Sequence, residues 1–373
     1  MARTEHHPTG LIHYNPRLSF RGYTLFTAQM NNAFLIDPKG RFVHRWQHER
    51  GITNAELLPN GNLLALTMPS PEVQGQRGLN GQAAASVELD WDNNILWEYN
   101  DPWIHHDQKR LANGNTLLLR WEPMPRRLIK RISGGYNATG DDPKHMLGDA
   151  VLEVTPTGSI ARKWRSWEHL DPDIDVICPL DDRREWTHAN SIDTAPNGDW
   201  VISFRRISTI IRVSPKRGEI KWRFNDESVR HQHDARFISS NRATFFDNGV
   251  HRKGIEYSRA VEISTRSKKI VWSYMDNPPF TLYTLMGGSV ERLPNGNTLI
   301  CETSKGHFLE VTQDGKVVWE YINPMFSTNP RLGGRMNMVF KVHRYSSGYP
   351  GLNGRKLKPD NLANLNQLYG PEV

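Results

Sequence analysis

The chain has 373 residues and a formal net charge of +7, a length that fits one large all-β domain or two smaller domains. The mean hydropathy is −0.62, and no apolar run approaches the roughly 20 residues of a membrane span, so no membrane partner is expected. The start, "MARTEHHPTGLIHYNPRLSF", lacks the apolar segment of a secretory signal. Cys178 and Cys301 have neither metal-ligand spacing nor a disulfide pattern. Together these features favour a soluble cytoplasmic protein.

The basic residues are spread along the chain rather than gathered in one region, and the densest run is "PRRLIKR" at 125–131. There is no RRM, helix-turn-helix or zinc-finger signature, so no nucleic-acid partner is expected. A positive net charge also attracts anionic small molecules. No pattern specifies an oligomeric state.

In chain order, the first recurring element is a hairpin that ends on a tryptophan. Its six copies lie roughly 50 to 70 residues apart, which is typical of propeller blades. The copies are "FLIDPKGRFVHRW" (34–46), "VELDWDNNILWEY" (87–99), "LEVTPTGSIARKW" (152–164), "IIRVSPKRGEIKWRF" (210–224), "AVEISTRSKKIVWSY" (260–274) and "LEVTQDGKVVWEY" (309–321). The tryptophan is expected in the core between blades, since large aromatic side chains dominate burial.

A second hairpin alternates with the first, and its Asn-Gly and Pro-Asn-Gly steps are turn chemistry. Its five copies cover 54–66, 106–119, 188–204, 233–246 and 289–300. Two hairpins make four strands, which is one blade. The strands that the first blade still needs are "GYTLFTA" at 22–28 and "NMVFKVHRY" at 337–345.

The sequence therefore predicts an all-β fold, a six-bladed β-propeller closed by the C-terminal strand pairing with the N-terminal strands. We expect a single domain over 1–373. The expected blades are approximately 20–46 plus 337–345, 54–99, 106–165, 188–223, 233–274 and 289–321. Three segments break the period, at 122–150, 166–187 and 323–336. Long loops of this kind are usually functional, so we expect them on a face of the disc.

Three of the second hairpins begin with histidine, in "IHHDQ", "WTHANSID" and "RHQHDAR". Innermost strands line the channel of a propeller, so histidines at one position of three such strands would converge. The residues concerned are His105, His106, His188, His231 and His233. Convergent histidines and arginines in a cleft indicate a functional site.

Pairing across each hairpin predicts the neighbours of these histidines. Residue 188 should lie opposite about residue 206, which brings Arg205 and Arg206 beside His188. A one-residue bulge would exchange the two arginines. The same reasoning places Asp247 and Asn248 beside His233, and Arg120 and Trp121 beside His106. Asp107 and Asp234 either fix ring tautomers or simply continue their strands.

The segments "WTHANSID…PNGDWVISFR…IIRVSPKRGEIKWRF", "QHDARF…FFDNG", "HHD…LANGNTLLL" and "VFKVHRYSSGYPGL" resemble the arylsulfate sulfotransferase family of six-bladed propellers, along about residues 20–355. The resemblance implies transfer of a sulfuryl group from an aryl sulfate to a phenolic or other hydroxyl acceptor. It also implies that the histidine matching His233 becomes transiently sulfated.

By the same resemblance, His188, Asn190 and Arg205 correspond to functional residues, and His106 matches the "HHD" histidine with His105 as the alternative register. The catalytic residues expected are His233, His188, His106 and Arg205. The substrate-binding residues expected are Asn190, His105, Arg206, His231 and Asn248. The partner would be a small anionic aromatic substrate, and no cofactor is expected.

Two alternatives remain open. Three inner-strand histidines, His106, His188 and His233, could hold a divalent metal with an open position, as in a metal-dependent lyase or hydrolase. The chain could also be a non-catalytic ligand-binding propeller, since a fold does not fix a function.

Overall fold

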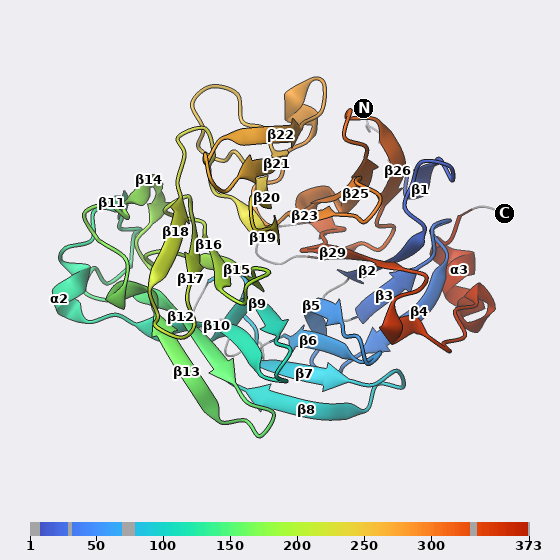
Figure 1. The fold of residues 1–373 in the computed structure, drawn as a ribbon, viewed down its shortest axis with the longest axis horizontal. Helices are drawn as coiled ribbons and strands as arrows, with labels where there is room; N and C mark the ends of the chain where they lie inside the picture. Colours follow the sequence, from blue (N-terminus) through green and yellow to red (C-terminus); the bar gives the residue numbers. More distant parts are fainter. Residues whose placement is uncertain (1–7, 29–31, 69–78, 329–333, 372–373) are drawn as a thin grey trace. The chain divides into compact units, whose positions relative to one another are not determined.

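The structure is a computed structural model that describes residues 8–28, 32–68, 79–328 and 334–371. The chain forms the six blades of a β-propeller, and the strands of each blade follow one another in a sheet (Figure 1). By contacts, the chain divides into two compact units. The first comprises residues 1–65, 89–94 and 288–373, and the second comprises 66–88 and 95–287. No helix in the described ranges is long and apolar enough to cross a membrane.

The second unit contains three complete blades, each with the strand order that the alternating hairpins predict. The strands are β9 (Ile104–Arg110), β10 (Thr116–Pro123), β12 (Leu147–Val154) and β13 (Ile160–Arg165); β15 (Ala189–Thr194), β16 (Trp200–Phe204), β17 (Thr209–Val213) and β18 (Ile220–Phe224); and β19 (His233–Ser239), β20 (Arg242–Asp247), β21 (Arg259–Ser264) and β22 (Ile270–Tyr274). In each sheet the second recurring hairpin supplies the first two strands and the tryptophan hairpin supplies the last two.

The first strands of these three blades are neighbours. The Ile192 N–H on β15 donates to Asp107 Oδ2 on β9 over 3.0 Å, and the Ala235 N–H on β19 donates to Ser191 Oγ on β15 over 3.1 Å. Asp107 therefore joins two strands. This geometry supports the option that Asp107 serves the strands rather than a histidine ring.

At two blade junctions of the second unit, the recurring tryptophan forms a hydrogen bond from its indole N–H to the following blade. Trp164 Nε1–H donates to the Gly218 carbonyl over 2.9 Å, and Trp222 Nε1–H donates to the Thr265 carbonyl over 2.7 Å. Each acceptor lies in the outer hairpin turn of the following blade. At these two blade junctions the indole ring packs between the blades, and its N–H donates to a turn carbonyl of the next blade. A tryptophan therefore contributes both apolar burial and a hydrogen bond at each junction.

Two segments that break the period fold together in the second unit. The first contains α2 (Arg126–Ile129) and β11 (Gly134–Tyr136), and the second contains η1 (Ser166–Glu168) and β14 (Ile177–Asp182). Strands β11 and β14 pair in parallel. Met124, Ile129, Met146, Ile177 and Trp186 join the buried cluster of the neighbouring blades. These two segments are therefore folded and packed against the core of the neighbouring blades.

The first unit contains the closing blade. Strand β29 (Val342–Ser346) pairs antiparallel with β2 (Gly22–Ala28), with His343 opposite Leu25, and β3 (Asn32–Ile36) and β4 (Phe42–Gln47) complete the sheet. The predicted closure by the C-terminal strand is confirmed. The C-terminal helix α3 (Ala363–Tyr369) is held to β4 by Asn366, whose Oδ1 accepts from the Phe42 N–H over 2.7 Å.

The other complete blade of the first unit has five strands, in the order β1-β26-β25-β24-β23. The bounds are β1 (Gly10–Tyr14), β26 (Val317–Ile322), β25 (His307–Val311), β24 (Thr298–Glu302) and β23 (Ser289–Arg292). Strand β1 pairs with β26 and was not predicted from the sequence. The remaining sheet, which has residues in both units, contains β5 (Ile52–Leu57), β6 (Leu63–Thr67), β7 (Ala85–Leu89) and β8 (Ile95–Asn100).

Short elements fill the connections: η2 (Pro279–Thr281), η3 (Thr303–Lys305), η4 (Pro350–Leu352), η5 (Pro359–Leu362), β27 (Ser327–Thr328) and β28 (Arg335–Met336). Of the period-breaking segment expected at 323–336, residues 329–333 lie outside the described residues.

Candidate functional site

The three inner-strand histidines start from equivalent places in the second unit. His106 lies near the start of β9, His188 immediately precedes β15, and His233 is the first residue of β19. All three side chains are buried, with residue exposures of 6%, 7% and 3%. The sequence pattern therefore corresponds to the start of each inner strand, although His106 and His188 have left-handed backbones and His233 does not.

Several of these histidines have a backbone conformation that most residues avoid. His106, His188, His231 and His251 have φ values of 54°, 53°, 57° and 61°, in the left-handed region. They are four of the eight non-glycine residues with positive φ in the described chain. A side chain costs roughly 1–2 kcal/mol there. Such strain concentrates at functional sites, because the surrounding structure holds it for a purpose.

His106 and His188 face each other, with ring centroids 4.5 Å apart and planes at 73°. Burial lowers the pKa of His106 well below its usual value, and the neighbouring His188, His105, His233 and Arg205 lower it further. Since each of these groups affects the pKa of His106 through its charge, we refer to His105, His106, His188, His233 and Arg205 together as the electrostatic unit. The imidazole of His106 is therefore neutral at neutral pH.

His105 supports His106 from behind. Its ring stacks on Trp121 with centroids 4.1 Å apart, and its Nδ1 lies 2.9 Å from His106 Nδ1. Its Nε2 lies 3.3 Å from Asp149 Oδ1. Of the two alternative registers, the structure turns His106 toward His188, while His105 stacks on Trp121.

Gly81 packs directly against the His106 ring. Gly81 has φ +80°, its carbonyl accepts from the His106 N–H over 2.7 Å, and a Cβ at this position would lie 2.3 Å from His106 Cε1 and Nε2. The imidazole of His106 therefore has room only because residue 81 has no side chain.

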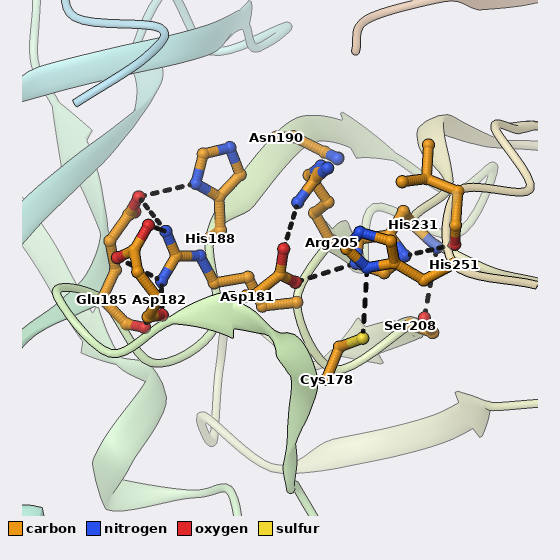
Figure 2. Close-up of polar contacts among 12 residues, drawn as sticks. Cys178, Asp181, Asp182, Glu185, His188, Asn190, Arg205, Ser208, His231 and His251 are labelled. Carbon is orange, nitrogen blue, oxygen red and sulfur yellow. Dashed lines mark hydrogen bonds and ion pairs between the residues drawn. The ribbon is translucent and has the colours of Figure 1, made fainter. Parts of the chain in front are cut away.

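His188 is oriented by a carboxylate that the sequence analysis did not identify. His188 Nδ1–H donates to Glu185 Oε1 over 2.8 Å (Figure 2). Trp121 Nε1–H donates to Glu185 Oε2 over 2.8 Å. Burial alone would raise the pKa of Glu185, but His188 and Arg206 outweigh it and hold the pKa at about 2. A fixed carboxylate on Nδ1 leaves His188 Nε2 for proton transfer.

The two arginines after β16 have different surroundings. The Arg205 N–H donates to the His188 carbonyl over 3.0 Å, whereas the Arg206 N–H donates to the Thr187 carbonyl over 3.1 Å. The expected pairing of residue 188 with residue 206 was therefore wrong by one residue. The reason is a one-residue bulge. Ser191 lies opposite Ser203, as the turn-centred count assumes, but the register shifts between Ser191 and Ala189, and Ala189 lies opposite Phe204.

The Arg205 guanidinium contacts Asp181, with Nη1 3.2 Å from Oδ1, and its side chain is 15% exposed. Arg206 instead contacts Asp182 and Glu185, with Nη2 3.1 Å and 3.4 Å from their carboxylate oxygens. Arg206 also donates to the Glu185 carbonyl. These contacts make Arg206 a brace for the Glu185 segment, while Arg205 belongs to the electrostatic unit of the histidines.

His233 has a defined tautomer. Asn248 Nδ2 donates to the carbonyls of Thr284 and Gly287 over 3.0 and 2.8 Å, so its Oδ1 accepts from His233 Nδ1–H over 2.7 Å. The lone pair is therefore on Nε2, which accepts from the Gly287 N–H over 3.3 Å. Burial lowers the pKa of His233 to about 3, and Arg205 contributes. The ring is a neutral imidazole with a directed lone pair at neutral pH.

Asn190 lies beside this group and is fully buried. Its Nδ2 donates to the Gln232 carbonyl over 2.7 Å, and its Oδ1 is buried with no hydrogen-bond partner. A buried polar atom without a partner is unfavourable unless a ligand or water satisfies it. Asn190 thus anchors the residue before His233 and still has capacity for a bound molecule.

His231 points away from the other three. Its Nδ1 lies 2.9 Å from the Val250 carbonyl and its Nε2 lies 2.8 Å from Asp181 Oδ2. It therefore contacts the carboxylate that also holds Arg205. Among the expected substrate-binding residues, His231 and Arg206 lie behind the electrostatic unit, whereas Asn248 directly orients His233.

Three expected neighbours have other partners. Arg120 lies opposite Ile104 and pairs with Asp101 and Glu122. Ion pairs join Asp247 to Arg252 and Arg259, and Asp234 to Arg236. These acidic and basic side chains are therefore engaged within and beside their own blades.

The site residues that the sequence did not indicate come from outside the repeated hairpins. They are Gly81 and the carboxylates Asp181 and Glu185 of the 166–187 segment. Trp121 was expected beside His106, but its bond to Glu185 was not. The run "DDRREWTH" carried a signal, because three acidic residues lie within seven positions of His188. The spacing alone does not say which carboxylate turns inward.

Metal ligands gather at a different place from the three inner-strand histidines. Among the described residues, one group of at least three His, Cys, Asp or Glu side chains brings its ligand atoms within 4.8 Å of one another: Cys178, Asp181, His231 and His251. His106, His188 and His233 do not form such a group. A divalent ion held by those three histidines stays a prediction.

Comparison with known proteins gives a family and a fold. A family model described as arylsulfotransferase (ASST) matches residues 85–324, well over half of the chain. No curated protein matches the sequence. A solved protein of unknown function from Bacteroides caccae is similar with a TM-score of 0.54 and 14% identity, covering 87% of this chain and 98% of that chain. At that identity the likeness bears on the fold alone.

Two further solved structures have lower similarity. A streptogramin B lyase has a TM-score of 0.47 and 12% identity, covering 91% of this chain and 93% of its own. The WD40 β-propeller domain of Doa1 has a TM-score of 0.47 and 8% identity, with the same coverage.

Proposed function

Because the chain belongs to the arylsulfotransferase family, we propose that it moves a sulfuryl group from an aryl sulfate to a phenolic or other hydroxyl acceptor through a sulfo-histidine at His233. The observation that carries the proposal is the tautomer of His233. Asn248 Oδ1 accepts a hydrogen bond from His233 Nδ1–H, which keeps the proton on Nδ1, so the Nε2 lone pair is the nucleophile. A pKa of about 3 keeps that lone pair unprotonated at neutral pH.

The first displacement forms a bond from His233 Nε2 to the donor sulfur and breaks the bond from sulfur to the aryl oxygen. The electron pair leaves with the aryl oxide, which takes the Nε2 proton of His188; in this proposal His188 begins the cycle as an imidazolium paired with Glu185, and the first displacement leaves it neutral. In the second displacement the acceptor oxygen attacks sulfur, the nitrogen–sulfur bond breaks, and the acceptor proton passes to His188. Splitting one transfer into two steps in this way is covalent catalysis.

Glu185 supports both proton transfers. Its carboxylate on His188 Nδ1 holds one ring orientation and stabilises the imidazolium that forms when Nε2 gains a proton. Trp121 and Arg206 hold Glu185 in place. In this proposal Glu185 and His188 act as an acid–base pair, and Glu185 is the positioning residue.

The sulfuryl oxygens need positive charge and hydrogen-bond donors. Arg205 supplies a planar guanidinium that suits a sulfate group. The His106 ring and the second Nδ2–H of Asn190, besides the one that donates to the Gln232 carbonyl, complete the polar surroundings. Preorganised donors in a buried site stabilise charge more strongly than water does.

The aryl group has a candidate pocket next to this machinery. A cavity of about 350 Å³ is lined by Trp103, Met124, Met146 and Leu147, and also by Arg183, Arg184, Asp141 and Asp142. The Trp103 carbonyl accepts from the N–H of Trp121, whose indole holds Glu185. The apolar walls suit an aromatic ring, while the two arginines balance the two aspartates, so the cavity would select for the ring rather than for its charge.

Intact-mass measurement after brief exposure to 4-nitrophenyl sulfate tests the proposal. The wild type is expected to gain the mass of one sulfuryl group and release nitrophenolate, whereas His233→Ala gains nothing. His13→Ala, which changes an exposed histidine in β1, should behave as wild type. Nitrophenolate release without an adduct on quenched protein, or an adduct that persists in His233→Ala, would contradict the covalent role of His233.

A further inference from the structure

Four side chains with metal-binding atoms meet next to the proposed catalytic group. They are Cys178 and Asp181 on β14, His231 before β19, and His251 after β20, and their ligand atoms all lie within 4.8 Å of one another. Cys178 Sγ lies 3.4 Å from His251 Nδ1, and His231 Nε2 lies 2.8 Å from Asp181 Oδ2 (Figure 2). Ligand atoms around one tetrahedral zinc ion are about 3.3–3.8 Å apart, as bonds of about 2.0–2.3 Å require.

The contacts of His231 aim its Nε2 at the carboxylate of the group. Its Nδ1 contacts the Val250 carbonyl, which can only accept, so Nδ1 carries a proton. Nε2 faces Asp181 Oδ2 at 2.8 Å, and either a second ring proton or a metal ion bound by both atoms satisfies this contact. A backbone carbonyl on the remote nitrogen is also the usual support of a histidine that binds metal.

The backbone departs from regular strand geometry and from preferred φ values where it brings these four residues together. Residues three apart in a regular strand point to opposite faces, yet Cys178 and Asp181 both reach His231. The pairing of β14 with β11 is irregular over this stretch, since Gly134 lies opposite Ile177 and Tyr136 opposite Asp182. His231 and His251 both have left-handed backbones. Their backbone N–H groups are held by Ser208 Oγ and Glu256 Oε1.

We propose that Cys178, Asp181, His231 and His251 form a zinc site that holds the β14 segment against the blade carrying His231. A thiolate, two imidazoles and one carboxylate are ligands that zinc prefers. All four coordination positions come from the protein, which is the arrangement of a structural site. On binding, the Cys178 thiol releases its proton to water and the sulfur bonds to the ion.

The site adjoins Arg205 without including it. Asp181 presents Oδ2 to the zinc site and Oδ1 to the Arg205 guanidinium. The Cys178 N–H also donates to the Arg206 carbonyl over 2.9 Å. The ion would therefore fix the segment that carries the carboxylate partner of Arg205.

The test is metal content and cobalt substitution of the full chain. Protein purified without chelator is expected to hold about one zinc per chain by elemental mass spectrometry. After removal of zinc and addition of Co²⁺, we expect visible bands of a tetrahedral ion and a near-ultraviolet thiolate-to-cobalt band. Cys178→Ser should abolish the thiolate band, and His251→Ala should lower the bound metal at least tenfold.

Two matched variants show whether the metal is held by these four residues or elsewhere in the chain. Cys301→Ala removes the other cysteine, which is buried in the first unit, and should keep the thiolate band. His233→Ala should keep the metal. Bound metal lost in His233→Ala but kept in Cys178→Ser would overturn the proposal, as would wild-type protein with no zinc and no thiolate-to-cobalt band. The wild-type spectrum decides the matter even if a variant fails to fold.

Discussion

At the scale of single residues, the candidate site depends on partners that fix each imidazole. Asn248 fixes His233, Glu185 fixes His188, and His105 supports His106. The chemistry needs histidines, but their usefulness comes from these partners, because a rotating ring has no defined donor or acceptor. Substitutions of the partners should therefore affect turnover without touching a reacting atom.

Glu185→Gln is expected to lower kcat for 4-nitrophenyl sulfate by about 100-fold or more, since the amide no longer stabilises a protonated His188. KM should change little, because Glu185 does not contact substrate in the proposed mechanism. Steady-state kinetics with Glu168→Gln, a surface carboxylate that pairs with Arg165, provides the comparison. An unchanged kcat would remove His188 and Glu185 from proton transfer.

Gly81→Ala tests the space around His106. The new methyl would lie 2.3 Å from the His106 ring, so we expect the ring to shift and kcat to fall at least tenfold. Gly158→Ala is the matched control, because Gly158 has a similar φ of +81° and nothing within 4 Å. Both variants should lose about 1 kcal/mol of stability from backbone strain. Equal activities would show that His106 does not need its present position.

The sequence predicted much of this site but not its supports. Histidines recur at the start of a repeated hairpin, so periodicity indicated three segments, and the family resemblance selected His106, His188 and His233 within them. Asn248 followed from hairpin pairing. Glu185, Asp181 and Gly81 could not be located, because they belong to segments outside the repeat, and pairing rules say nothing about the path of such segments.

At the scale of elements, the segments outside the repeated hairpins supply carboxylates that contact the arginines and histidines of the candidate site. Strand β14 delivers Asp181 and Asp182 to consecutive arginines, and the residues after it deliver Glu185 to His188. The strand count and the hairpins were predictable from turn chemistry and alternation. Strand β1 was not predicted, because "GLIHY" is short and has no hairpin partner next to it in sequence.

Strand β25 makes the stability of its blade depend on pH. His307 Nδ1 and Nε2 lie 3.1 and 2.9 Å from carboxylate oxygens of Glu302 and Glu320. Burial alone would lower the pKa of His307, but these two carboxylates raise it to about 9. Because the folded pKa exceeds the unfolded value of about 6.5, the stabilisation is complete below pH 6.5 and is lost as the pH rises through 9.

The expected loss is on the order of 3 kcal/mol between pH 6.5 and pH 9.5. Urea unfolding at a series of pH values measures it. His307→Gln should remove this part of the pH dependence, whereas His13→Ala should keep it. A wild-type stability that is flat over this range would show that His307 is not protonated in the folded protein.

At the scale of the whole molecule, the propeller depends on a strand from the far end of the chain. Strand β29 pairs with β2 along five residues. Arg344 on β29 is fully buried at its side chain, with Nη1 3.1 Å from Glu310 Oε2 and its guanidinium carbon 4.4 Å from the Trp319 ring centre. The repeat count predicted this closure, because one blade was short of strands at both ends of the sequence.

Ending the chain after Lys341 should therefore prevent cooperative folding, since β2 would become an unpaired edge and Glu310 would lose its buried partner. Ending it after Leu357 removes η5 and α3 but keeps β29, and we expect cooperative unfolding at reduced stability. Solubility and urea unfolding of both truncations measure this. Equal behaviour would mean that β29 contributes no more than the C-terminal helix.

The left-handed backbones of His106, His188, His231 and His251 also have an evolutionary consequence. Each position would be more relaxed as glycine, so selection for stability alone favours replacing these histidines. If the proposed reaction and zinc site are right, a descendant that abandoned both would be expected to drift toward glycine or asparagine at all four positions while keeping its blades. The identity of these four residues in any relative is thus a test of whether that relative still uses the site.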